Sequence, residues 1–243
     1  VRYVIFDIRP TDEDSLQTKR LLEDIKNDWA RAEDDSLFLA RESRDAYDTT
    51  YYGPGDLSEL IRNNLYGEEV GTLYGPYLEE GYYKVARLLD KKDDSLNYYR
   101  ASHILIRPEG STEADSAAAF KEAKELMQRV KDGESFEALA AEFGTDGTAQ
   151  KGGDLGWFKE GDMVAPFQEA VKKNSKGDLD VVQTRFGAHV IKVTADPSNK
   201  VVQIGIIERQ VIPSSETIDN ADQEAREFRA KVDGEVSFEE TAL

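Results

Sequence analysis

The 243-residue sequence has no cysteine, only two histidines and no apolar run longer than four residues. The absence of cysteine excludes disulfides, thiolate chemistry and the common structural zinc sites, but it leaves the cellular compartment open. Apolar runs of four residues fall far short of the roughly 20 that a transmembrane helix needs, so no segment is predicted to span a membrane. The sequence begins at Val1 with no methionine and no signal peptide, which predicts an excised stretch of a longer protein.

Basic residues are also scarce, because 31 Lys and Arg stand against 49 Asp and Glu, for a net charge of −18. No basic stripe offsets this charge locally, and such a surface would repel a phosphate backbone or an anionic membrane. The composition therefore predicts no nucleic-acid partner. With 39% hydrophobic residues the chain still has the apolar side chains of a folded protein, and its length fits two domains or one large one.

Apolar strand-like runs recur at a spacing of about one small domain, at residues 3–6, 103–106 and 204–207. Each run is followed by a proline turn, a long amphipathic helical pattern and a second short helical segment, at 35–40, 134–140 and 235–239. The first two copies also end alike, since 75–85 and 183–193 both show a strand, a glycine turn and a strand. A unit of strand, helices and terminal hairpin predicts an α+β fold with a mostly antiparallel sheet.

This repeat predicts three successive domains, at residues 1–97, 98–196 and 197–243, of which the third is truncated. The predicted boundaries fall in two polar stretches, 90–97 and 196–200, and the second of these contains the linker-like sequence that starts at Pro197.

Both histidines lie in the middle unit, where His103 opens the first strand and His189 lies in the last. The first unit has Tyr3 and Tyr83 at the aligned positions, and the third unit has no histidine. A lone strand histidine is usually a core residue, but the confinement of both to one unit favours a shared site. Two histidines and a carboxylate also form the ligand set of a facial metal triad, which would require both imidazoles to turn toward one ion together with Asp146.

A glycine-rich loop at 145–158 lies between the histidines in sequence and has no counterpart of similar composition in the first unit. Gly152, Gly153 and Gly156 permit positive φ and close backbone approach, which suits a loop that folds over a site. The loop lacks the Lys-Ser/Thr pair of a phosphate-binding P-loop, so a nucleotide site is a weak alternative.

Four segments of the middle unit form a specific pattern: Ser102-His-Ile-Leu-Ile106, Gly152-Gly-Asp-Leu-Gly-Trp-Phe158, Met163-Val-Ala-Pro-Phe167 and Thr184-Arg-Phe-Gly-Ala-His-Val-Ile191. In order and spacing they resemble the parvulin (PpiC-type) peptidyl-prolyl cis–trans isomerases over about residues 99–195. The flanking parvulin-like segments make the whole arrangement similar to bacterial PpiD and SurA-type periplasmic folding factors. The resemblance implies repeated parvulin-like domains, each an antiparallel four-stranded sheet covered by helices.

The resemblance also implies the residues of the site: a catalytic group of His103, Asp146, Thr184 and His189, and a proline-ring pocket of Leu155, Met163 and Phe167. In this pattern the histidines pair at the floor of the site, Asp146 takes the central Cys-or-Asp position and Thr184 bonds toward the histidines. No metal and no cofactor is implied. Phosphate-directed relatives carry Lys and Arg after the first strand, whereas residues 109–115 are acidic here, so a preference for phosphorylated Ser/Thr-Pro is not expected.

The resemblance therefore implies a prolyl isomerase that acts on unfolded or proline-containing polypeptides in the periplasm, and it leaves open a membrane anchor outside this stretch. Residues 1–97 lack the histidines and the glycine loop, so we expect this unit to be catalytically silent. Two alternatives remain at this point: a peptide-binding chaperone, or holdase, with little turnover, and an architectural spacer that displays clients to another protein.

Overall fold

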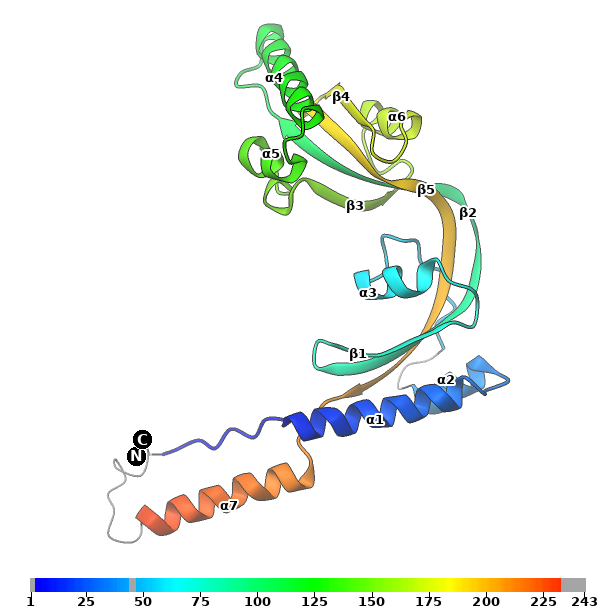
Figure 1. The fold of residues 1–243 in the computed structure, drawn as a ribbon, viewed down its shortest axis with the longest axis vertical. Coiled ribbons are helices and arrows are strands. Elements are labelled where there is room, and N and C mark those ends of the chain that lie inside the picture. Colours follow the sequence, from blue (N-terminus) through cyan, green and yellow to red (C-terminus); the bar gives the residue numbers. More distant parts are fainter. Residues whose placement is uncertain (1–2, 44–46, 233–243) are drawn as a thin grey trace. The chain divides into compact units, whose positions relative to one another are not determined.

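The computed structural model describes residues 3–43 and 47–232 (Figure 1). In chain order its helices and strands are α1 (Asp12–Trp29), α2 (Asp35–Glu42), α3 (Glu59–Ile61), a π-helical turn η1 (Arg62–Tyr66), β1 (Leu73–Glu79), β2 (Tyr82–Ile106), α4 (Glu113–Lys131), α5 (Phe136–Phe143), a 3₁₀ turn η2 (Ala149–Lys151), β3 (Asp154–Lys159), α6 (Ala165–Lys173), β4 (Leu179–Thr184), β5 (Gly187–Gln210) and α7 (Ser215–Val232). Within these residues, no helix is both long enough and apolar enough to cross a bilayer.

The strands form one sheet in the order β1-β2-β5-β4, and β3 pairs with β2. The β1–β2, β2–β3 and β4–β5 pairs are all antiparallel. The predicted α+β class is therefore confirmed, and both predicted glycine-turn hairpins are present as β1–β2 and β4–β5.

Contacts between residues divide the described chain into two compact units. Unit 1 contains residues 3–43, 47–49, 67–89 and 204–232, and unit 2 contains residues 50–66 and 90–203. These units are assembled from separate segments and are not the successive domains predicted at residues 97 and 196. That three-domain division stays a prediction about repeats along the chain.

Unit 1 joins the start of the chain to its later part through one buried carboxylate. Asp14 closes the capping box of α1 by accepting from the Thr11 amide, 2.8 Å away. The same carboxylate accepts from the Ser214 amide at 3.1 Å and from the Thr217 hydroxyl at 2.8 Å. Because these hydrogen bonds favour the charged form, the pKa of Asp14 lies well below its usual range. Asp14 thus fixes the starts of α1 and α7 to one another.

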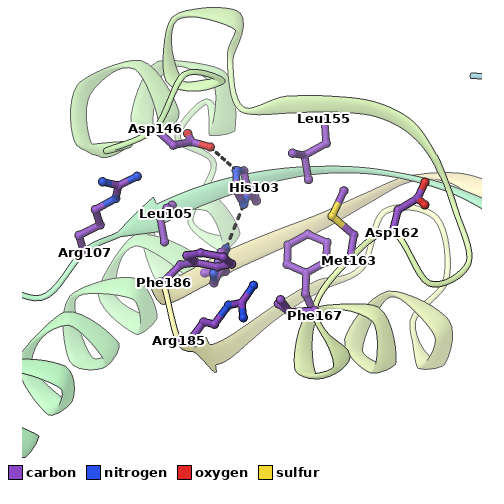
Figure 2. A pocket seen from close by; sticks show the side chains of 12 residues that line it. His103, Leu105, Arg107, Asp146, Leu155, Asp162, Met163, Phe167, Arg185 and Phe186 are labelled. Atoms are coloured by element: carbon purple, nitrogen blue, oxygen red, sulfur yellow. Dashed lines mark hydrogen bonds and ion pairs between the residues drawn. The ribbon is translucent and has the colours of Figure 1, made fainter.

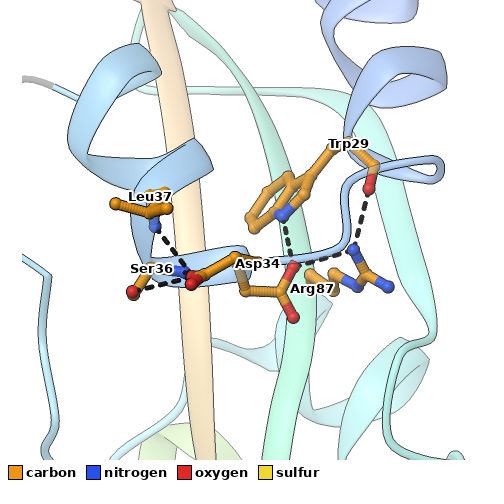
Figure 3. A network of polar contacts seen from close by, with 6 residues as sticks. Trp29, Asp34, Ser36, Leu37 and Arg87 are labelled. Carbon is orange, nitrogen blue, oxygen red and sulfur yellow. Dashed lines mark hydrogen bonds and ion pairs between the residues drawn. The ribbon is translucent and has the colours of Figure 1, made fainter.

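The core of unit 1 lies where α1 and α2 meet β2 and β5, around the fully buried Trp29. The Trp29 ring stacks on Phe38 of α2, and its indole nitrogen donates to Asp35 at 2.7 Å. Arg87 of β2 donates to both the Trp29 carbonyl and the Asp35 carboxylate at 2.8 Å. Figure 3 shows this network beside Asp34, whose side chain caps the first amides of α2. Two helices and a strand are thereby tied together around one indole.

The prediction of a strand at residues 3–6 is wrong, because this segment is irregular and pairs with no strand. Tyr3 and Ile5 are about three-quarters exposed, and Phe6 makes an edge contact with Phe228 of α7. An apolar run forms a stable strand only where a neighbour supplies backbone partners. The first copy therefore keeps the helices and the hairpin of the repeat but lacks its opening strand.

The polar stretches 90–97 and 196–200 are strand, not linker, since β2 and β5 run through them without a break. Lys200 on β5 forms an ion pair with Asp93 on β2, and the Tyr66 hydroxyl donates to the Lys200 carbonyl at 2.7 Å. Their polarity reflects exposed side chains on a paired ribbon rather than the absence of structure. The third apolar run, 204–207, lies in the same strand β5, and the predicted helix at 235–239 falls outside the described residues.

In unit 2 the two faces of the sheet bury different residues. Even-numbered side chains such as Ile104, Ile106 and Val190 pack against α4 and α5 in one core. Odd-numbered neighbours such as Ala101 and Ile191 pack with α6 and β3 in another. Because strand side chains alternate between faces, this register decides which face each histidine occupies.

Candidate active site

Both histidines lie on the face of the sheet that α6 covers. His103 alternates with Ile104 on β2, and His189 alternates with Val190 on β5, so both rings point away from α4 and α5. Each is buried, with 6% and 4% of the residue exposed. Phe167 of α6 presents its ring edge to both imidazoles, at centroid distances of 5.8 and 5.5 Å. The histidines are therefore held between two strands and one aromatic ring.

A continuous chain of hydrogen bonds joins the two histidines to Asp146 and Thr184, and Figure 2 shows the part that includes Asp146 and His103. His103 Nδ1 lies 3.0 Å from His189 Nδ1, and its Nε2 lies 2.9 Å from Asp146 Oδ2. On the other side, His189 Nε2 lies 2.8 Å from the Thr184 hydroxyl. The structure thus brings together all four residues predicted as the catalytic group, although they come from one loop and three strands.

The ionisation states of Asp146 and His189 determine which atoms donate in this hydrogen-bond network. Burial would raise the pKa of Asp146, but hydrogen bonds from His103 and Thr148 outweigh it and lower the pKa below the ordinary value. Burial, with His103 nearby, lowers the pKa of His189 to about 4, so this imidazole is neutral at pH 7. An ionised Asp146 only accepts, so His103 donates to it from Nε2. With His103 as a neutral imidazole, its Nδ1 accepts from His189 and His189 Nε2 accepts from Thr184, so every polar atom of the network has a partner.

Two local features place Asp146 beside His103. Thr145 donates from both its amide and its hydroxyl to the Leu105 carbonyl, at 3.0 and 2.8 Å, and so anchors the loop to the end of β2. Thr148 donates its hydroxyl to the second carboxylate oxygen of Asp146 at 2.9 Å. The carboxylate is therefore oriented from both sides, while 20% of its side chain stays exposed.

The glycine-rich loop closes directly onto the backbone of His103. The Gly153 carbonyl accepts from the His103 amide at 2.8 Å. Gly153 has φ +76°, and a Cβ there would lie 2.2 Å from the His103 carbonyl oxygen. The close approach predicted from sequence is therefore confirmed at Gly153, where no larger residue fits.

A cavity of about 350 Å³ opens above the network. Its lining includes His103, His189, Asp146 and all three predicted ring-pocket residues, Leu155, Met163 and Phe167. Thr184 does not line it and acts from behind His189. The roles assigned to these residues stay a prediction, but they share one largely apolar cavity with a carboxylate at its edge.

Six lining residues were not predicted from sequence: Leu105, Arg107, Asp162, Val164, Arg185 and Phe186. The period-two pattern of β2 places Leu105 on the same face as His103, so it was accessible to sequence reasoning. Arg107, Arg185 and Phe186 lie just beyond strand ends, where no periodic signal exists. Their place at the cavity depends on the tertiary arrangement alone.

The alternative of a facial metal triad does not fit this geometry. All four ring nitrogens of the two histidines are within hydrogen-bonding distance of a partner, and two of them face each other. Among residues 3–43 and 47–232 no group of three or more metal-ligating side chains is assembled.

An antiparallel sheet with a buried histidine pair, a carboxylate and an apolar cavity defines a small α+β domain with a peptide-sized site. Residues 83–197 match the family described as the PPIC-type PPIase domain. This stretch of the chain is therefore a peptidyl-prolyl cis–trans isomerase domain of the parvulin type. Unit 2 extends beyond the matched stretch, because residues 50–66 also belong to it.

The chain is similar to two groups of curated proteins. It is 46% identical over 99 residues to the foldase protein PrsA of Bacillus subtilis, covering 40% of this chain and 30% of that protein. It is 33% identical over 192 residues to the chaperone SurA of Methylococcus capsulatus, covering 76% of this chain and 38% of that one. The crystal structure of PrsA from Bacillus subtilis aligns at 32% identity over 60% of this chain and 47% of that chain, with a TM-score of 0.34. The chain thus spans less than half the length of these relatives.

Proposed function

We propose that the cavity of unit 2 binds the proline of an Xaa-Pro peptide and accelerates its cis–trans isomerisation without a covalent step. The observation that carries this proposal is the position of Leu155, Met163 and Phe167 in one cavity with the network of His103, His189 and Asp146. Isomerisation breaks no bond, so a site for it needs a ring pocket and a fixed electrostatic environment rather than a nucleophile.

The ring pocket lowers the barrier by holding one side of the rotating bond. The barrier of about 18–20 kcal/mol arises because amide resonance is lost as the C–N bond twists. With the proline ring held against Met163 and Phe167, only the acyl side rotates, and exclusion of water removes hydrogen bonds that stabilise the planar, polar amide. Each 1.4 kcal/mol or so removed from the barrier speeds the reaction about tenfold.

The network supplies the fixed electrostatic part of the site. Since His189 is neutral and His103 donates to Asp146, the Asp146 carboxylate is the charged group of the network. We assign this carboxylate to the neighbourhood of the carbonyl oxygen of the rotating bond, where it disfavours the planar resonance form that places negative charge on that oxygen. The histidines serve to orient Asp146 and do not exchange protons with the substrate.

For the whole protein we propose a folding role toward exported, proline-containing polypeptides in the periplasm, with no requirement for phosphorylation. The relatives named foldase PrsA and chaperone SurA support the first part. The acidic stretch at 109–115 supports the second, because it comes soon after the end of β2 and would repel a dianionic phosphate.

Exchange spectroscopy by NMR on an unphosphorylated Xaa-Pro peptide tests this proposal. Uncatalysed exchange takes tens to hundreds of seconds, so even weak turnover is visible. We expect acceleration by the full chain that falls about tenfold or more in Asp146→Ala and Met163→Ala. The matched control is Tyr83→Phe, in the hairpin of unit 1, which should keep the full rate. No acceleration by the unmodified chain would contradict the proposal.

A second candidate, a holdase, is favoured by a separate observation in unit 1. Several large apolar residues there are exposed: Tyr3, Ile5, Ile8, Leu16, Ile212 and Ile218. Exposed apolar side chains of this kind suit contact with apolar segments of unfolded chains. Suppression of client aggregation that survives Asp146→Ala but is lost in the combined variant Ile5→Ser, Leu16→Ser and Ile218→Ser would support it, and loss in Asp146→Ala alone would contradict it.

A further inference from the structure

One buried polar side chain of α6 belongs neither to the histidine network nor to the lining of the cavity. Gln168 directly follows the pocket residue Phe167, and only 6% of it is exposed. Its Oε1 accepts from the Gly161 amide, 3.3 Å away, whereas its Nε2 is buried without a partner. A buried donor without a partner costs stability, so an apolar side chain would serve packing better at this position.

Gln168 reaches back to the loop that carries Met163 to the cavity. This loop joins β3 to α6, and Figure 2 shows Asp162 and Met163, both from it, beside the cavity. Helix α6 begins after Val164, which makes no side-chain cap. The bond from Gln168 to Gly161 fixes the incoming chain instead, much as the Glu or Gln of a capping box bonds back to the backbone before its helix.

The start of the same loop is fixed independently of Gln168. The Glu160 amide donates to the Asn97 carbonyl at 2.8 Å, and the Glu160 carboxylate accepts from Lys172 at 3.0 Å. Asp162 accepts from the Lys159 amide at 2.8 Å and closes a turn at the end of β3. These contacts hold the loop to the strands and to the last turn of α6, so Gln168 is left as the tie to the part of α6 that carries the pocket.

Met163 needs a fixed backbone more than a stiffer side chain would. Methionine has three rotatable bonds and adapts to irregular gaps, and Met163 is only partly buried against the core cluster that contains Phe167. The two residues form a preformed pocket only while the loop keeps its place beside α6. A site that is formed part of the time has a Kd raised by the inverse of that fraction, without a change in the chemistry of the bound state.

We propose that Gln168 is a positioning residue for the proline-ring pocket, and that it acts through the Gly161 amide to hold Met163 beside Phe167 before the peptide binds. This inference rests on the proposed isomerase function and adds a residue to its machinery. Because Gln168 does not line the cavity, it does not touch the peptide. Its loss should therefore raise the Kd of Xaa-Pro peptides and leave the exchange rate at saturating peptide within about twofold.

Two variants of the full chain separate this role from packing. Gln168→Leu removes the acceptor and the unpaired donor together, so denaturant unfolding should show equal or greater stability while the Kd from chemical-shift titration rises about three- to tenfold. Gln168→Glu keeps an oxygen within reach of the Gly161 amide but buries a charge, so stability should fall while the Kd stays within about twofold. Stability and affinity should thus change in opposite order in the two variants.

The chain also offers a direct probe of the loop, because Met127 and Met163 are its only methionines. Methyl-labelled methionine gives two NMR signals, and Met127 packs on the other face of the sheet as an internal reference. In Gln168→Leu without peptide, the Met163 signal should shift or broaden and the Met127 signal should not. The matched control is Asn174→Ala, which removes an amide at the end of the same helix that donates to the Ala170 carbonyl at 2.8 Å. It should change neither the Kd nor the two signals.

Four results would overturn the proposal. They are an unchanged Kd in Gln168→Leu, an unchanged Met163 signal in that variant, an equal loss of affinity in Gln168→Glu, and an equal loss in Asn174→Ala. If the unmodified chain accelerates no peptide, the isomerase proposal fails, but the Met163 signal and the Kd values still test the positioning role separately.

Discussion

The two hairpins of the sheet follow the same local pattern and do different chemistry. In unit 1, β1 and β2 meet at Gly81, and Tyr83 uses its hydroxyl to contact Ser15 of α1 at 3.3 Å. In unit 2, β4 and β5 meet at a turn that ends in Gly187, and His189 lies between His103 and Thr184. The Tyr83 hydroxyl of the first hairpin thus contacts a helix, whereas the His189 ring of the second belongs to a hydrogen-bond network beneath a cavity.

The difference shows that the hairpin alone does not make a site. The site of unit 2 also needs a second strand that carries His103 on the same face, and a loop that brings Asp146 to it. Unit 1 lacks the opening strand at residues 3–6 and the glycine-rich loop. We therefore expect perturbations of matched positions to change isomerisation only in unit 2.

The largest effect is expected for Gly153→Ala, because this glycine lets the loop of unit 2 approach the backbone of His103. A Cβ at φ +76° would both strain the backbone and collide with the His103 carbonyl. We expect about 2–3 kcal/mol less stability in denaturant unfolding, together with loss of peptide turnover. Gly147→Ala, in the same loop, has open space around the new Cβ and should be tolerated. Equal behaviour of both variants would show that the loop does not depend on this contact.

A smaller effect is expected in the pH dependence of stability. An unfolded histidine has a pKa of about 6.5, whereas burial lowers the pKa of His189 to about 4 in the fold. Between these values the unfolded chain binds more protons, so the free energy of unfolding should fall as the pH drops from about 6.5 to 4 and should be level above that window. Chemical denaturation at a series of pH values measures this slope. It should flatten in His189→Gln and persist in Tyr83→Phe, and a slope unchanged by His189→Gln would contradict the assignment.

The smallest effect is expected from removing one hydroxyl from each hairpin. Thr184→Val deletes the donor to His189, and Ser15→Ala deletes the partner of Tyr83. Each should cost about 1 kcal/mol of stability or less, which is typical of one hydrogen bond. Peptide exchange measured by NMR should slow several-fold in Thr184→Val alone, because the Thr184 hydroxyl helps to orient the histidine pair and the Ser15 hydroxyl does not contact it. Slowing of similar size in Ser15→Ala would remove the distinction between the two hairpins.

Sequence reasoning reached most of the site because four segments of unit 2 resemble the parvulin pattern in order and spacing. The apolar runs around Ile104 and around Val190 predict strands, and the glycines predict a loop that approaches closely. It failed at residues 3–6, because their apolar pattern is typical of a strand but no strand pairs with them. It also read 90–97 and 196–200 as boundaries, because polarity alone does not distinguish an exposed ribbon from a linker.

The sequence by itself determined the α+β class and the concentration of both histidines in one unit, since each depends on local pattern or composition. Only the tertiary structure decided that β2 and β5 are neighbours, which sets His103 and His189 3.0 Å apart although 86 positions separate them. It alone brought Arg107 and Arg185 to the cavity. The physical reason is that strand pairing depends on burial and backbone partners far away in the chain, which no local pattern encodes.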